Sequence, residues 1–289
     1  MTIVHHDKRK QSLLPPTERE KKGTTRSVTT TPLITFDHVT KSFGGPDLPP
    51  AVNDLSLNVA QGEFLAIVGG SGSGKTTLLR LANRLTDPDS GSIHIDGEDI
   101  AMIDPITLRR RIGYVFQNGG LFPHMSVADN IGITPKLLGT PAAQIKADVD
   151  ELLDLVQLDR AVHRDRFPNE LSGGQRQRVS VARALAAKPR IVFMDEPFGA
   201  LDPLTRDALG DDYLALHRKL GLTTIMITHD MTEAILLADR IAVMRTGKLL
   251  AQGAPEDLAV SKDDYVNELI GTPRRQAKRL AAFLPRDSA

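Results

Sequence analysis

Short apolar segments alternate with longer stretches of helical periodicity along most of the chain. Brief apolar runs that end in glycine or polar residues are typical of strands buried in a sheet. They predict strands over Leu33–Phe36, Leu55–Val59, Phe64–Val68, Ser92–Gly97, Ile191–Met194, Thr223–Ile227 and Ile241–Met244. Apolar residues spaced three and four apart predict helices over Lys75–Leu85, Val127–Ile131, Ala142–Val156, Gln175–Ala187, Pro203–Leu220 and Met231–Ala238.

The order of these elements indicates the fold class. Strands and helices alternate near both ends of the pattern, whereas the segment from about Pro123 to Ala187 is mostly helical. Alternation of this kind predicts an α/β fold with a parallel core sheet, here interrupted by a helical insertion over about 118–187. Residues 263–289 are predicted to form a helical tail, in which Gly271 and Pro273 are expected to break any helix.

Charge is balanced overall but unevenly distributed. Lys and Arg number 36, as do Asp and Glu, yet residues 1–32 and residues 272–289 each carry a net charge of +4 and leave the middle acidic. The Pro-rich, Thr-rich and charged composition of residues 1–31 predicts a disordered basic extension. An acidic body argues against a nucleic-acid partner. Basic ends suit either plain solvation or an anionic membrane surface.

Three absences from the sequence narrow the function further. The chain has no cysteine, which excludes disulfides and thiolate chemistry. Its apolar runs are far shorter than the roughly 20 residues that span a bilayer. Its N-terminus lacks the apolar segment of a secretory signal. A function at a membrane would therefore need another chain to supply the spanning segments.

A phosphate-binding loop is the first candidate site. Its residues fit the pattern G-x-x-x-x-G-K-[ST] and lie between a predicted strand and a predicted helix; they are Gly69, Gly70, Ser71, Gly72, Ser73, Gly74, Lys75 and Thr76. Glycines let backbone N–H groups curl around phosphate oxygens, and the following helix N-terminus favours anions. Lys75 is expected to neutralise phosphate charge, and the Thr76 hydroxyl to ligate Mg²⁺. An ordinary glycine-rich turn would have no need for Lys-Thr at the helix start.

Two further strands end in polar side chains. Asp195 and Glu196 follow the apolar run Ile191–Met194, and His229 follows Thr223–Ile227. Successive strand side chains point to opposite faces, so Asp195 is placed to reach Mg²⁺ and Glu196 to orient or deprotonate a water molecule. His229 is expected to contact the γ-phosphate, because ligands of open α/β folds gather at this edge of the sheet.

A family resemblance follows from the segment Leu171-Ser172-Gly173-Gly174-Gln175, which resembles the signature of ABC ATPases. The order of motifs agrees with that family: phosphate loop, Gln117, this signature, Asp195-Glu196, Gly199-Ala200-Leu201-Asp202 and His229. The resemblance covers about Leu33 to Gly271. It implies a P-loop NTPase ABC ATPase domain over 32–262, with a parallel core sheet, an antiparallel β subdomain and a helical subdomain.

The resemblance also implies roles for individual residues. In the family, two chains pair head to tail, and the signature of one closes over the ATP of the other. The residues expected to act in trans are therefore Ser172, Gly173, Gly174, Gln175 and Asp202. Gln117 resembles the family's Q-loop glutamine, which touches Mg²⁺ or water. Phe43 matches the aromatic residue that stacks on adenine, Val52 is a further adenine contact, and Thr77 completes the phosphate contacts. The implied cofactors are ATP and Mg²⁺.

The subclass is inferred from what surrounds the cassette. One cassette without a spanning segment or an inserted coiled coil is similar to a subunit that works with separate transmembrane permeases, at the cytoplasmic face of the inner membrane. The segments Gly120–Val127 and Glu196–Pro203 are similar to those of glycine betaine and choline importers, which implies a substrate-binding protein as a further partner. Many such subunits carry CBS modules, for which residues 263–289 leave no room. The segment Leu121–Asn130 is expected to dock the permease, although its apolar side chains also suit a core.

Two alternatives remain open. One is an ATPase subunit that serves a different solute, or a lipid-transport or export system. The other, from a different class, is an ATP-dependent switch on DNA or ribosomes. Co-purification with a permease or with nucleic acid separates them.

Overall fold

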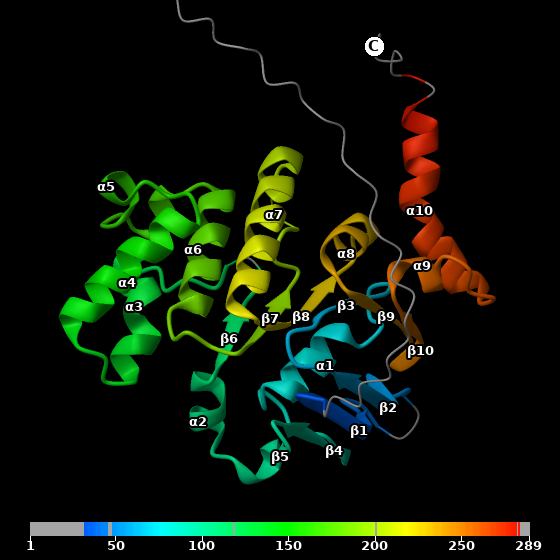
Figure 1. Cartoon of the computed structure of the whole chain (residues 1–289). Coiled ribbons are helices and arrows are strands. Elements are labelled where there is room, and N and C mark those ends of the chain that lie inside the picture. The colour runs from blue at the N-terminus through cyan, green and yellow to red at the C-terminus, as the bar shows by residue number, and fades with distance from the viewer. Residues whose placement is uncertain (1–31, 46–47, 118, 200, 282, 284–289) are drawn as a thin grey trace, which may run out of the picture. The chain divides into compact units, whose positions relative to one another are not determined.

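The computed structural model describes residues 32–45, 48–117, 119–199, 201–281 and 283. The predicted disordered extension over 1–31 lies outside these residues. The described chain contains two sheets (Figure 1). One has six strands, in the order β10-β9-β3-β8-β7-β6, and the other has four, in the order β2-β1-β4-β5.

The six-stranded sheet forms the centre of the fold. Its strands are β3 (Phe64–Val68), β6 (Ile112–Val115), β7 (Ile191–Asp195), β8 (Thr223–Thr228), β9 (Arg240–Arg245) and β10 (Lys248–Gly253). All adjacent pairs are parallel except β9 and β10. The expectation of a parallel core sheet is confirmed, and the continuous apolar sequences of β3 and β7 agree with their complete burial.

The smaller sheet is antiparallel and covers one face of the first. Its strands are β1 (Ile34–Lys41), β2 (Val52–Val59), β4 (Ser90–Ile95) and β5 (Glu98–Asp99). Helix α1 (Lys75–Ala82) lies between the two sheets, and one apolar core joins its leucines to Leu65 and Ile67 of β3 and to Ile34 of β1. The neighbouring residues of β3, among them Ala66, belong to a second core on the opposite face. The antiparallel subdomain is therefore confirmed.

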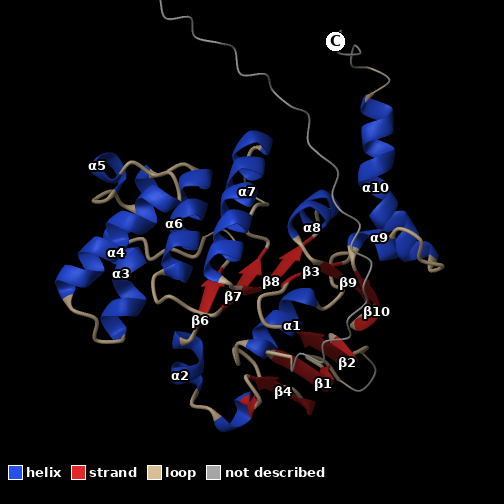
Figure 2. Ribbon diagram, in the orientation of Figure 1, coloured by secondary structure: helices blue, strands red, loops and turns tan. Residues whose placement is uncertain are grey.

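The segment between β6 and β7 is built from helices, as Figure 2 shows. A short 3-10 turn at Ile100–Met102 and α2 (Pro105–Arg110) precede β6. After β6 come α3 (Val127–Leu137), α4 (Ala142–Leu155), α5 (Arg160–His163), a second 3-10 turn at Pro168–Glu170 and α6 (Gly173–Leu185). Helices α3, α4 and α6 pack on one another through Ile131, Val149 and Val179, which are all buried in the second core.

The remaining helices cover the second face of the central sheet and lead to the C-terminal end. They are α7 (Pro203–Leu220), α8 (Met231–Leu237), α9 (Pro255–Leu258) and α10 (Asp264–Leu280). Helix α7 begins and ends where the sequence predicts, since Asp202 caps its N-terminus and Gly221 adopts a left-handed conformation at its end.

Helix α10 corrects one expectation. Gly271 and Pro273 were expected to break any helix, yet α10 runs through both of them. Proline removes one backbone donor and bends a helix rather than always ending it, and Figure 1 shows that α10 bends along its length. Two side chains support the turn before the proline: Thr272 Oγ1 and Arg275 donate to the Glu268 carbonyl at 2.8 and 2.6 Å.

Candidate functional site

The phosphate loop connects β3 to α1 and has the conformation that its glycines permit. Gly74 has a φ of 100° at the N-cap of α1, and an added Cβ would lie 2.1 Å from the Ala51 carbonyl oxygen. A Cβ on Gly69 would lie equally close to the Met244 carbonyl oxygen. Side chains at these two positions would therefore push the loop away from its neighbours. A cavity of about 230 Å³ opens beside the loop and is lined by Ala51, Gly72, Ser73, Gly74, Lys75, Thr76 and Thr77.

Lys75 is folded back into this loop. Its Nζ donates to the carbonyls of Gly69 and Gly70 at 2.8 and 2.9 Å and lies 3.3 Å from Ser73 Oγ. Burial lowers the pKa of Lys75, while the nearby carboxylates of Glu196 and Asp195 raise it. The loop therefore holds a cation at the centre of its backbone curl, where phosphate oxygens would replace the carbonyl partners.

Two of the three predicted metal ligands, Thr76 and Asp195, lie side by side, whereas Gln117 contacts Glu196. Thr76 Oγ1, in the first turn of α1, donates to Asp195 Oδ1 at the end of β7 across 3.2 Å. Burial raises the pKa of the Asp195 carboxyl, the hydrogen bond from Thr76 lowers it, and Glu196 raises it again. A bound cation would favour the ionised carboxylate. One hydroxyl and one carboxylate suit Mg²⁺, which usually keeps few protein ligands and completes its shell with phosphate oxygens and water.

The side chain of Glu196, which follows β7, contacts residues from the loops that follow β6 and β8. Its Oε2 accepts a hydrogen bond from Gln117 Nε2 at 2.9 Å, and its Oε1 lies 3.3 Å from His229 Nδ1. Its φ of 48° is in the left-handed region, which is uncommon for a residue other than glycine and costs conformational energy. This backbone turn directs Glu196 away from the strand interior, where Asp195 is buried. The structure thus brings together Glu196 and His229, which the sequence placed at separate strand ends, and Gln117, which the family resemblance indicated.

The predicted trans residues form a second group. Ser172 caps α6 in a reciprocal box, accepting from the Gln175 N–H at 3.2 Å while the Ser172 N–H donates to Gln175 Oε1 at 2.9 Å. Gly173 and Gly174 form the first turn of this helix and are partly exposed. Asp202 caps α7 by accepting from the Thr205 N–H at 3.0 Å, and its hydrogen bonds with Thr205 lower the pKa of its carboxyl.

The two predicted adenine contacts differ in exposure. The Phe43 side chain is 66% exposed, and Lys41 Nζ lies 5.7 Å from the centre of its ring. An exposed aromatic face is available for stacking on a base. Val52, by contrast, is fully buried in the core between the two sheets and offers no side-chain surface to a nucleotide in this conformation. Leu55, Leu57 and Val59 of β2 face inward in alternation, and a register shift between Leu55 and Val52 turns Val52 to the same side.

The segment expected to dock a permease has a mixed environment. Leu121 packs against the second core and Met125 is partly buried. Phe122 is exposed, and the Arg183 guanidinium lies 5.8 Å from the centre of its ring. Arg183, near the end of α6, also donates to the carbonyls of Gly119 and Gly120 at 3.0 and 2.8 Å. The sequence analysis missed this arginine. It links the helix that begins at the signature to the loop that follows Gln117.

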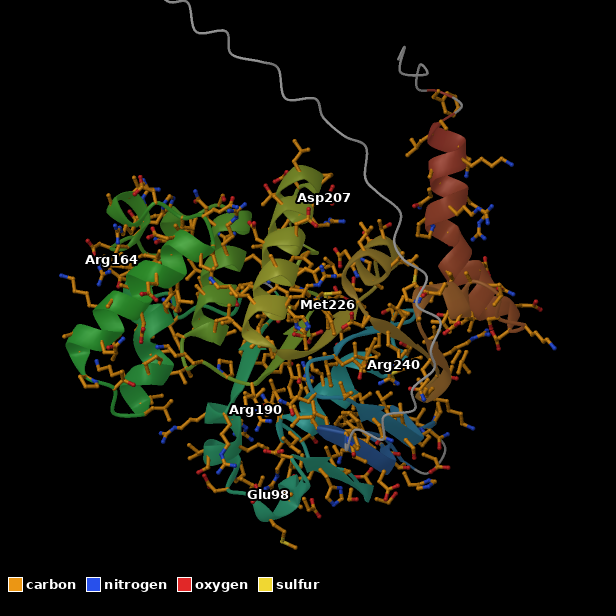
Figure 3. All side chains as sticks on the ribbon, viewed as in Figure 1. Glu98, Arg164, Arg190, Asp207, Met226 and Arg240 are labelled. Atoms are coloured by element: carbon orange, nitrogen blue, oxygen red, sulfur yellow. The ribbon has the colours of Figure 1, made fainter. Side chains whose placement is uncertain are left out.

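A larger cavity lies away from this site. It measures about 790 Å³ and is lined by residues at the start of β6 and β7 and by the edge of the small sheet, among them Ile95, Arg111 and Ile112. Figure 3 shows Arg190 at that end of β7, and its guanidinium is paired with Asp96 at 3.0 Å. The polar strand ends at Asp195 and His229 lie at the other end of the parallel strands, where ligands bind in open α/β folds.

Two features are absent from the described residues. No helix among them is long and apolar enough to cross a membrane. No group of three or more His, Asp or Glu side chains in the same part of the chain is arranged to hold a metal ion.

Comparisons with known proteins agree with this geometry. Residues 52–199 match the family model described as ABC transporter. The chain is 48% identical over 243 residues to the choline transport ATP-binding protein OpuBA of Bacillus subtilis (strain 168), covering 84% of this chain and 63% of that protein. It is 47% identical over 240 residues to the glycine betaine uptake system ATP-binding protein YehX of Escherichia coli (strain K12), covering 83% and 77%.

A solved structure gives the same result for the fold. The ATP-binding cassette MJ0796, determined as a dimer in a post-hydrolysis state bound to ADP and Pi, superposes with a TM-score of 0.70 at 32% identity. The match covers 76% of this chain and 98% of that one. With the family model, the relatives and the fold in agreement, the chain belongs to the ABC transporter family, among its ATP-binding cassettes.

Proposed function

We propose that this chain binds and hydrolyses ATP to energise a membrane importer for glycine betaine, choline or a related quaternary amine. The observation that carries the ATPase part is the convergence of Gln117 and His229 on Glu196, beside the phosphate loop. The solute is inferred from relatives named for choline transport and for glycine betaine uptake. The chain spans 63% of the length of the first of these, so the cassette is what they share.

Nucleotide binding is assigned to the phosphate loop and to Phe43. The N–H groups of Gly72–Thr77 and the Lys75 ammonium would surround the phosphates, and the Phe43 ring would stack on the base. Thr76 and Asp195 would hold Mg²⁺, with Gln117 on the same side, and that ion supplies charge neutralisation on the phosphates. Val52 would contribute only if its strand shifted, because its side chain is buried.

Hydrolysis is assigned to Glu196. Its carboxylate would accept a proton from a water molecule as the water oxygen bonds to the γ-phosphorus and the bond to the β–γ bridging oxygen breaks. Gln117 and His229 already contact this carboxylate, at 2.9 and 3.3 Å, and so hold it near the phosphate loop. His229 would contact the transferred phosphoryl group from the far side of Glu196.

A second copy of the chain would complete the site. Ser172, Gly173 and Gly174 present the N-terminus of α6, a favourable environment for an anion, at the surface of the helical part. Gln175 stabilises that helix start from inside the capping box, and Asp202 lies at the exposed start of α7. A two-fold dimer would bring these groups of one copy to the ATP of the other. The dimeric MJ0796 structure supports this arrangement.

The remaining partners are inferred from relatives that are named as ATP-binding proteins of transport and uptake systems. We propose separate permease subunits that carry the spans, a substrate-binding protein, and a peripheral position on the cytoplasmic face of the inner membrane. ATP-driven closure of the dimer would move the permeases, because ATP favours the closed state over the open one.

Reconstitution in liposomes tests the proposal. The chain is purified with the permease that co-purifies with it, and ATP hydrolysis is measured with glycine betaine, choline, carnitine, putrescine or sulfate and the cognate binding protein. Stimulation by quaternary amines alone is expected. Stimulation by another solute would support the alternative importer, and co-purification with nucleic acid instead of a permease would overturn the transport function.

A further inference from the structure

The C-terminal helix is tied to the phosphate loop by one side chain. Tyr265, in the first turn of α10, accepts a hydrogen bond from the Gly70 N–H at 3.0 Å. Gly70 is the second residue of the loop and is exposed. A Cβ added to Gly70 would lie 3.6 Å from the tyrosine oxygen, an ordinary van der Waals contact. There is therefore room for a small side chain at Gly70, and the tyrosine hydroxyl contacts the glycine through its backbone N–H.

Contacts on the tyrosine ring and on helix α10 hold the Tyr265 hydroxyl in place. Arg245, at the end of β9, places its guanidinium 4.7 Å from the centre of the tyrosine ring, a stabilising cation–π geometry. Val266 and Ile270 anchor the same helix in the second core, where α10 packs on α8. Asp263 caps α10 by accepting from the Val266 N–H at 3.0 Å. The hydroxyl is thus presented to the loop by a helix that is fixed on its other side.

The backbone carbonyl and the backbone N–H of Gly70 have different partners. Its carbonyl oxygen is bound within the loop, by the Ser73 N–H at 3.2 Å and by Lys75 Nζ at 2.9 Å. Its N–H points outward to Tyr265. Elsewhere the loop is held by the Gly247 N–H, which donates to the Ser73 carbonyl at 3.1 Å. The bond to Tyr265 therefore fixes the first half of the loop, and the bond from Gly247 fixes the second.

We propose that Tyr265 is a positioning residue for nucleotide binding, which couples the C-terminal helix α10 to the affinity of the phosphate loop for MgATP. The inference rests on the proposed ATPase function. Glycine-rich backbone loses much conformational freedom when it is ordered. A loop already held at Gly70 loses less freedom when phosphates bind, so preorganisation by Tyr265 raises affinity. Tyr265 acts through Gly70 and is given no contact with the reacting atoms.

The variant Tyr265→Phe tests this in the full chain. Removing one neutral hydrogen bond is expected to raise both the Kd for a fluorescent ATP analogue with Mg²⁺ and the KM for ATP about fivefold. The kcat at saturating ATP is expected to stay unchanged. Hydrogen exchange of the peptide that covers Gly69–Ser73 should become faster, while exchange in β7 and β8 stays as in the wild type. An unchanged KM, or a lower kcat with an unchanged KM, would overturn the proposal.

Tyr213→Phe is the matched control. Tyr213 is fully buried in α7, and its hydroxyl lies 2.8 Å from Thr224 Oγ1, with no contact to the loop. It loses one hydroxyl hydrogen bond, as Tyr265→Phe does. Its thermal stability is expected to fall while the KM for ATP stays constant. If both variants raised the KM equally, the effect of Tyr265 would be general destabilisation, and the proposal would be wrong.

A double-mutant cycle then examines the route through Gly70. Proline has no backbone N–H and its ring carbon takes the place of that hydrogen, so Gly70→Pro removes the donor and excludes the Tyr265 hydroxyl from this position. On that background Tyr265→Phe is expected to change the KM no further, whereas an additive fivefold increase would contradict the assigned contact. The wild-type arm separates the two hypotheses: no MgATP binding by the wild type would refute the proposed function itself, while normal wild-type binding with no effect of Tyr265→Phe refutes only the role of Tyr265.

Discussion

The side-chain amide of Gln117 donates a hydrogen bond to the carboxylate of Glu196 across 2.9 Å. Gln117 follows β6 and leads into the helical segment, whereas Glu196 follows β7 in the central sheet. A movement of the helical segment would therefore shift a direct partner of the carboxylate assigned to activate water. The same carboxylate lies 3.3 Å from His229 Nδ1, so the position of Glu196 depends both on the loop after β6 and on the loop after β8.

Glu196→Gln should abolish turnover while keeping this arrangement. The amide has nearly the same shape and its oxygen can still accept from Gln117, but it cannot take a proton from water. We expect a loss in kcat of at least about a hundredfold, the usual contribution of a general base. Size-exclusion chromatography with MgATP should show a stable dimer. Steady-state turnover equal to that of the wild type would remove Glu196 from the catalytic role.

Lys75→Ala should weaken the binding of MgATP at least tenfold and eliminate hydrolysis. The ammonium lies at the centre of the phosphate loop, bonded to the carbonyls of Gly69 and Gly70. Its loss leaves these carbonyls facing the phosphates without a cation between them. Equilibrium binding of a fluorescent ATP analogue measures the change, and Lys219→Ala, at the exposed end of α7, is the control. Wild-type affinity in Lys75→Ala would contradict the phosphate-loop assignment.

A feature of the fold or of the site could be predicted from the sequence when residues close to it in the chain determine it. Lys75, Asp195 and His229 were predicted because each directly follows a buried strand or opens a helix, and parallel strands bring their ends to one edge. Helix α10 was mispredicted at Pro273, because the local rule for proline ignores the burial of Ile270 and its neighbours, which holds the helix in place.

Other contacts between distant residues escaped sequence analysis. Tyr265 meets Gly70 across 195 positions of sequence, and nothing in the residues near Tyr265 indicates a phosphate loop. Val52 was expected at the nucleotide on the strength of the resemblance alone, and the strand register places it in the core instead. Such positions depend on how the two sheets pack, which no local pattern specifies.

Arg183→Ala should destabilise the protein and loosen the loop that follows Gln117. The guanidinium is buried, which lowers the pKa of Arg183 to about 10, and it bonds the carbonyls of Gly119 and Gly120. Removing it leaves the carbonyl of the buried Gly119 without this partner, whereas the carbonyl of the exposed Gly120 can bind water, so the expected cost is about 1–3 kcal/mol in the free energy of unfolding. Denaturant titration measures this loss.

A conservative variant and a surface control show whether the loss of stability comes from the two hydrogen bonds of Arg183. Arg183→Lys should restore only part of the stability, because one ammonium cannot reproduce the planar fork that serves both carbonyls. Arg218→Ala, at an exposed position in α7, should be neutral. If Arg183→Ala unfolded at the same denaturant concentration as the wild type, the two hydrogen bonds would contribute nothing measurable.

His217 should make the folded protein less stable in mildly acidic solution. Its ring is buried in α7, beside Phe64 and 3.0 Å from Thr224 Oγ1. Burial lowers the pKa of His217 below its ordinary value; the charge of Asp239 and a hydrogen bond with the Gly62 backbone oppose this, and Arg218 adds to it. Below about pH 6.5 the unfolded chain therefore binds a proton that the native protein does not. Stability is lost as the pH falls from there to the lower native pKa.

The variant His217→Gln isolates this effect. It removes the titrating ring but keeps a polar side chain that can reach Thr224, so its absolute stability is lower while the difference from the wild type shrinks as the pH falls from 7.5 to 5. The slope of that difference cannot exceed about 1.4 kcal/mol per pH unit for one proton. His124→Gln, at an exposed position, should run parallel to the wild type across the same range. A constant difference between His217→Gln and the wild type would mean that the buried ring accepts its proton as readily as an exposed one.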